Sequence, residues 1–148
     1  MQSKAANKEN PVPIFKDTEQ LYDCVGAILE YLRDYPPARD AFLKSGLIIR
    51  FKYTAPDGEI TIDGSHDPIG LTCGPCDRVP TVDMSMSSDT AHQFWLGKVN
   101  LVAALTRGTM TAKGPIPAIM KLLPAITPAY KQYPEILRAK GLESLIDA

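Results

Sequence analysis

Residues 97–123 read GKVNLVAALTRGTMTAKGPIPAIMKLL, a stretch in which glycines separate three short elements. Asn100 is a favourable helix cap, and the apolar residues after it predict a helix that ends at Gly108. Residues 109–113 alternate in the manner of a strand. Gly114-Pro115 then opens another helix, because proline is tolerated in a first turn. Helix, strand and helix in such close succession form the strongest structural pattern of the chain.

Before this stretch, the sequence predicts two helices followed by a run of strands. Apolar residues at three- and four-residue spacing indicate the helices, and alternation with a period of two indicates the strands. A Pro-Asp-Gly turn at 56–58 joins two strands into a hairpin. Helices are expected at 18–34, 37–44 and 88–96, and strands at 47–54, around Ile60 and Ile62, at 69–72 and at 79–86. This order predicts an α+β fold, with an antiparallel sheet and helices on one face.

The stretch from Met86 to Leu123 resembles the sterol carrier protein type 2 family. The resemblance is carried by Gly97-Lys98-Val99-Asn100, Ala104-Leu105, Gly108, the strand TMTAK, Gly114 and Ile119-Met120-Lys121-Leu122. It implies a five-stranded, largely antiparallel sheet covered on one face by helices, with an apolar tunnel between them. It also implies non-catalytic binding or transfer of a fatty acid, acyl-CoA or sterol-like lipid, with no cofactor.

The chain departs from the family in four places, one of which is the segment 124–148 that extends past the family's usual core. Leu101 stands where proline is common, Pro115 and Pro117 flank the second glycine region, and the loop at 64–78 contains two cysteines. The expected organisation is a flexible tail at 1–13, a sterol-carrier-like lipid-binding domain at 14–123, and a helical C-terminal extension at 124–148 packed on the same domain. Pro134 is expected to kink or split the helix of that extension.

Large apolar side chains of the sheet and the helices are the candidates for the ligand-binding wall. They are Phe51, Met84, Met86 and Met110 from the sheet, and Phe94, Trp95, Val102, Leu105, Ile119, Met120 and Leu123 from the helices. Methionine is flexible and polarizable, so it suits an adaptable apolar site. The alternative is that these side chains simply pack on one another.

Cys73-Gly74-Pro75-Cys76 is the tetrapeptide of thioredoxins, and it offers a second hypothesis. Cys73 and Cys76 would form a redox pair, which would make the chain a dithiol enzyme. The alternatives are a structural disulfide and a turn between strands that simply carries two thiols. A strand pattern follows the tetrapeptide here, whereas a reactive cysteine usually opens a helix. A third hypothesis is an accessory interaction domain with a vestigial cavity. No zinc pattern is present in the sequence, so no metal is expected, and His92 is expected at the surface or at its boundary.

The composition is that of a globular protein, and it argues against a membrane-spanning protein and against a dedicated nucleic-acid binder. Hydrophobic residues make up 45% of the chain, and the net charge is −1. No apolar run of signal-peptide or membrane-spanning type occurs, so a cytoplasmic protein is expected. Residues 97–148 carry seven Lys and Arg against three Asp and Glu. This is either a chance asymmetry of solvated faces or a mildly basic face that makes transient contact with an anionic membrane surface or binds a phosphate-bearing ligand. The expected partner is a lipid or acyl-chain ligand, and the sequence does not predict the oligomeric state.

Overall fold

The computed structural model describes residues 12–148, so most of the tail expected at 1–13 lies outside the described residues. Two helices come first, α2 (Thr18–Asp34) and α3 (Pro36–Ser45). The strands β2 (Ile48–Thr54), β3 (Gly58–Asp63), β4 (Gly70–Cys73) and β5 (Val82–Ser87) follow. Next come α4 (Ser88–Trp95), α5 (Leu101–Arg107), β6 (Met110–Lys113), α6 (Ile116–Met120), α7 (Leu123–Ile126), α8 (Ala129–Ala139) and a final 3₁₀ turn (Glu143–Leu145).

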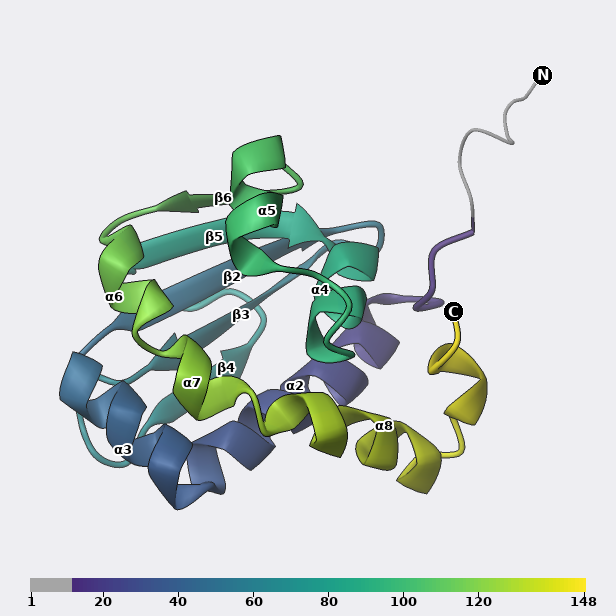
Figure 1. Cartoon of the computed structure of the whole chain (residues 1–148), viewed down its shortest axis with the longest axis horizontal. Helices are drawn as coiled ribbons and strands as arrows, with labels where there is room; N and C mark the ends of the chain where they lie inside the picture. Colours follow the sequence, from purple (N-terminus) through teal and green to yellow (C-terminus); the bar gives the residue numbers. More distant parts are fainter. Residues whose placement is uncertain (1–11) are drawn as a thin grey trace.

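The five strands form one mixed sheet in the order β4-β3-β2-β5-β6 (Figure 1). The predicted hairpin is confirmed, since β2 and β3 are antiparallel with Tyr53 opposite Gly58. The outer pairs β3–β4 and β5–β6 are antiparallel too. The central pair β2–β5 is parallel, with Phe51 opposite Met84. The predicted five-stranded α+β fold is therefore confirmed, and its one parallel pair lies at the centre of the sheet.

The two faces of the sheet differ in polarity, as the alternating sequence predicts. Ile49 and Tyr53 of β2 are buried, and Val82 and Met84 of β5 lie on the same face. Between them in sequence, Arg50 and Asp83 form an ion pair on the opposite face, with 2.5 Å between Nη2 and Oδ2. The helices therefore cover only the apolar face (Figure 1).

Local sequence signals place the ends of the covering helices. The Asp17 side chain accepts a hydrogen bond from the Gln20 backbone amide at 2.8 Å, which starts α2. Asn100 caps α5 by accepting from the Ala103 amide at 2.9 Å, as predicted. The cap of α4 is Ser87, whose side chain accepts a hydrogen bond from the Thr90 backbone amide. The Ser88 hydroxyl is buried and donates to the Pro56 carbonyl oxygen.

The C-terminal segment lies along the first helix (Figure 1). Its main helix, α8, buries Ala129, Tyr133 and Leu137. Pro134 lies inside this helix, which continues through it, so of the kink or split expected from the sequence the split does not occur. Within residues 12–148, no helix combines the length and the apolar character that crossing a membrane requires.

Candidate ligand-binding cavity

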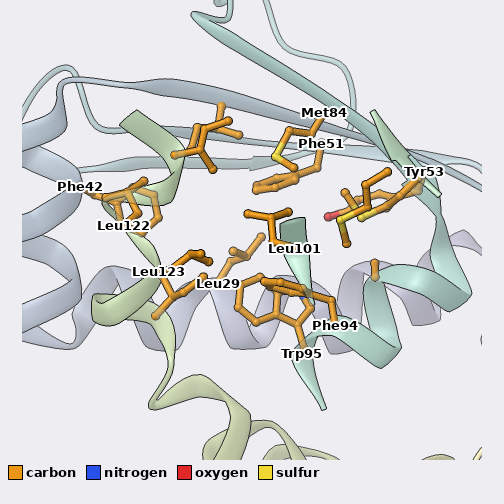
Figure 2. Close-up of a pocket in the computed structure, with 16 residues that line it drawn as sticks. Leu29, Phe42, Phe51, Tyr53, Met84, Phe94, Trp95, Leu101, Leu122 and Leu123 are labelled. Atoms are coloured by element: carbon orange, nitrogen blue, oxygen red, sulfur yellow. The ribbon is translucent and has the colours of Figure 1, made fainter. Parts of the chain in front are cut away.

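A narrow apolar cavity lies between the covered face of the sheet and the helices (Figure 2). Strands β2, β5 and β6 supply one side, and α2, α3, α4, α5, α6 and α7 supply the other. Its volume is about 60 Å³. A cavity of this size holds on the order of four water molecules, so a long ligand enters only if the wall moves. The tunnel implied by the resemblance therefore stays a prediction.

Eight of the eleven side chains predicted for the wall do line this cavity. They are Phe51, Met84, Met86, Phe94, Trp95, Met110, Ile119 and Leu123. Their contact with a ligand stays a prediction. The structure brings them together because the apolar faces of β2, β5 and β6 meet α4 and α6 over the same part of the sheet.

Val102, Leu105 and Met120 were also predicted for the wall, but they lie outside it. Helix α5 begins at Leu101, and its buried residues are Leu101 and Ala104. Val102 is therefore turned away from the core and is 53% exposed. Leu105 and Met120 are half-buried beside the core rather than in the cavity wall.

Eight further residues line the cavity without having been predicted from the sequence. They are Leu29, Phe42, Ile49, Tyr53, Ala91, Leu101, Leu122 and Ile126. Their apolar spacing gave a usable signal for some of them: Leu29 is four residues after Val25, and Ile49 and Tyr53 alternate with Phe51. No local signal indicates that Phe42 of α3 reaches the cavity, because this depends on how α3 packs.

The chemistry of the wall is almost entirely that of hydrocarbon and thioether groups. None of the sixteen lining side chains is Asp, Glu, Lys, Arg or His. The two that carry a polar atom are Tyr53, through its hydroxyl, and Trp95, through its indole nitrogen. Burial raises the pKa of Tyr53 well above its usual value, so this hydroxyl stays neutral. The wall therefore offers no base, nucleophile or charge for catalysis.

The cysteine tetrapeptide lies outside the cavity, at the end of β4. Cys73 is exposed and Cys76 is half-buried, and both are free thiols. The tetrapeptide leads into an extended segment rather than into a helix. The pKa of Cys73 is raised, mainly by partial desolvation and further by the charge of Glu30. A reactive thiol needs the opposite shift, so this environment does not activate Cys73. Among residues 12–148, no group of three His, Cys, Asp or Glu side chains is placed to hold a metal ion.

His92 is fully buried, contrary to the surface position expected from the sequence. Its Nε2 lies 2.7 Å from the Leu145 carbonyl oxygen, and its Nδ1 lies 2.8 Å from the Tyr133 hydroxyl oxygen. A carbonyl only accepts, so Nε2 carries the proton and Nδ1 accepts from Tyr133. Burial lowers the pKa of His92. Through these two hydrogen bonds, the neutral imidazole links α4 to α8 and to the 3₁₀ turn that follows α8.

Comparison with known proteins supports the fold. No family model and no curated protein sequence matches the chain. Sterol carrier protein 2 from Yarrowia lipolytica, in its apo form, matches with a TM-score of 0.58 and 17% identity over 72% of this chain and 88% of that one. Sterol carrier protein domain 2 of Helicoverpa armigera matches with a TM-score of 0.56 and 19% identity over 74% of this chain and 91% of that one.

A third structure, described as the ubiquinone synthesis protein UbiJ-SCP2, matches with a TM-score of 0.54 and 12% identity. That match covers 70% of this chain and 85% of the other. Identities this low establish similarity of fold. The chain therefore has the sterol carrier protein 2 fold, as the sequence from Gly97 to Leu122 indicates.

Proposed function

We propose that this chain binds a lipid or another long apolar molecule in its cavity, without covalent chemistry. The observation that carries the proposal is the composition of the wall: sixteen side chains, none of them ionised, enclose a space between sheet and helices. The names of two proteins with the same fold describe them as sterol carriers, which supports the proposal. Fatty acids, acyl-CoA and sterol-like lipids are the candidate ligands.

The driving force for binding is removal of the ligand chain from water. Each buried CH₂ group contributes about 0.8 kcal/mol, less the cost of ordering ligand and wall. The cavity must widen as the ligand enters, and its wall suits this. Met84, Met86 and Met110 have flexible side chains. On the opposite side, α6 and α7 are short helices.

The proposal predicts that filling the cavity weakens lipid binding. Trp95 is the single tryptophan of the chain and lines the cavity, so its fluorescence reports on ligand entry. Wild-type protein titrated with dodecanol should show a saturable change in this fluorescence. Leu101→Phe should weaken binding about tenfold, because the added ring displaces about two CH₂ groups of ligand.

The matched control is Val102→Phe, which adds an aromatic ring to the same helix outside the wall. This variant should bind as the wild type does. Equal weakening by both substitutions would place the ligand elsewhere. A wild-type protein that takes up no lipid, fatty acid or acyl-CoA would contradict the proposal and favour an accessory domain with a closed cavity.

A further inference from the structure

The hydroxyl group of Tyr53 points into the cavity (Figure 2). Tyr53 lies on the covered face of β2, is 4% exposed and belongs to the cavity wall. Its hydroxyl forms no hydrogen bond between residues of the described part of the chain. It is not one of the fully enclosed polar atoms without a partner, which among the described residues are Thr61 Oγ1 and Asp63 Oδ2, so it faces the open space of the cavity. The other tyrosine buried to this extent, Tyr133, differs, because its hydroxyl pairs with His92.

An unpaired hydroxyl inside an apolar wall is unfavourable. Taking a hydroxyl out of water without a new hydrogen bond costs about 1–3 kcal/mol in proteins. A phenylalanine at this position would fill nearly the same space without that cost. The feature that distinguishes Tyr53 from phenylalanine is its ability to donate and accept one hydrogen bond inside the cavity.

The surroundings of this hydroxyl suit an uncharged partner. The cavity wall contains no Lys, Arg or His to balance a carboxylate. The ionisable groups that bear most on Tyr53 are Cys73 and Tyr22, and neither supplies a positive charge. An ionised carboxylate placed beside Tyr53 would lose its hydration and gain one hydrogen bond. The cost of removing the charge from water exceeds the gain from that hydrogen bond.

We propose that Tyr53 determines the class of ligand: its hydroxyl forms a hydrogen bond with a single uncharged hydroxyl or carbonyl group at one end of the bound lipid. The cavity then selects neutral lipids over ionised fatty acids. Tyr53 lies at one end of the wall and Phe42 and Leu122 at the other, so the apolar chain extends from Tyr53 toward these two residues (Figure 2). This inference rests on the proposed function, since it requires a lipid in the cavity.

The test compares three ligands of equal chain length on the full chain, with Trp95 fluorescence as the measurement. Dodecanol carries a neutral hydroxyl, dodecanoate is ionised at about pH 8, and dodecane has no polar group. Wild-type protein should bind dodecanol more tightly than dodecanoate. Tyr53→Phe should weaken dodecanol binding about fivefold, the value of one hydrogen bond, and leave dodecane binding unchanged.

Two controls separate a polar contact from a general loss of packing. Tyr31→Phe removes a hydroxyl from α2 outside the cavity, and it should change the binding of none of the three ligands. Tyr53→Phe should also leave the free protein at least as stable to urea as the wild type, because it removes an unpaired buried hydroxyl. A large loss of stability would show that the hydroxyl is paired in the free protein, and would overturn the inference.

The remaining outcomes divide between the inference and the proposed function. If Tyr53→Phe weakens the binding of dodecane as much as the binding of dodecanol, Tyr53 only packs against the hydrocarbon chain of the ligand and the inference fails. If wild-type protein binds dodecanoate as tightly as dodecanol, selection for neutral ligands fails. In both cases lipid binding itself stands. If the wild type binds none of the three, the proposed function fails as well.

Discussion

At the scale of single residues, His92 joins segments that are distant in the sequence. Its imidazole contacts the Tyr133 hydroxyl of α8 and the Leu145 carbonyl oxygen near the end of the chain. Burial lowers the pKa of His92 and so favours the neutral ring. The hydrogen bond to the Leu145 carbonyl and the charge of Asp89 oppose this shift, and the charge of Lys98 adds to it. Helix α4, which carries His92, also supplies Phe94 and Trp95 to the cavity wall. Protonation of this buried imidazole therefore bears on the helix that forms the candidate site.

The lowered pKa of His92 predicts that stability falls as the solution becomes acidic. The unfolded chain takes up a proton at His92 near its ordinary pKa of 6.5, whereas the folded protein does so only at lower pH. The contribution of His92 to the free energy of unfolding is therefore complete above pH 6.5. Below pH 6.5 it declines by at most about 1.4 kcal/mol per pH unit. Urea unfolding measured between about pH 5 and pH 7 should show this slope.

Two variants identify the group responsible. His92→Gln should flatten the profile over this range, at a cost in stability at neutral pH. His66→Gln alters the half-exposed histidine beside Asp63, and it should retain most of the slope. A slope that survives His92→Gln would contradict the assignment.

At the scale of elements, the two glycines that flank β6 have different structural roles. Gly108 ends α5 with φ +80°, and an added Cβ would meet no atom within 4 Å. Gly114 joins β6 to α6 with φ +129°, and an added Cβ would lie 2.3 Å from the Thr81 carbonyl oxygen. Gly114 is therefore required both by its dihedral angle and by close backbone contact with the segment that enters β5.

Alanine substitution should separate these two roles. Gly108→Ala should lower the free energy of unfolding by about 1 kcal/mol, which is the cost of a left-handed conformation alone. Gly114→Ala should cost on the order of 3 kcal/mol, because the backbone of β5 must also shift. Urea unfolding of the two variants measures the difference. Equal losses would mean that the contact with Thr81 relaxes without cost.

At the scale of the whole molecule, the C-terminal helix completes the hydrophobic core. Tyr133 and Leu137 of α8 are fully buried, and α8 packs along α2, which covers the sheet. After α8, the Leu142 backbone amide donates a hydrogen bond to the Leu137 carbonyl oxygen at 2.8 Å, where the chain turns toward His92. Helix α8 therefore shares a core with the sheet, and we expect it to unfold together with the sheet.

Shortening a buried side chain of α8 tests this cooperativity. Leu137→Ala should lower the free energy of unfolding by about 2–5 kcal/mol. Ile136→Ala, at the half-buried neighbouring position, should cost clearly less. Far-UV circular dichroism and Trp95 fluorescence should give the same urea midpoint for Leu137→Ala. If the circular dichroism change precedes the fluorescence change, α8 unfolds independently.

Particular residues show how far the sequence predicts the fold and the site. The alternation of β2, the Pro-Asp-Gly turn and the Asn100 cap are local features, and the structure confirms each of them. Val102 was assigned to the wall because apolar character alone does not settle which face of a one- or two-turn helix is buried. Tyr53 was missed because its alternation shows burial but not the direction of its hydroxyl.

The sequence by itself determined which segments form helices and strands, which face of each is apolar, and where glycine is needed, because these depend on short-range periodicity and backbone sterics. Only the tertiary structure decided that β2 and β5 pair in parallel, that Phe42 and Leu29 reach one cavity, and that His92 is buried. These features depend on which apolar faces meet and how closely they fill the space between them. That is a property of packing between residues far apart in the chain, which no local pattern encodes.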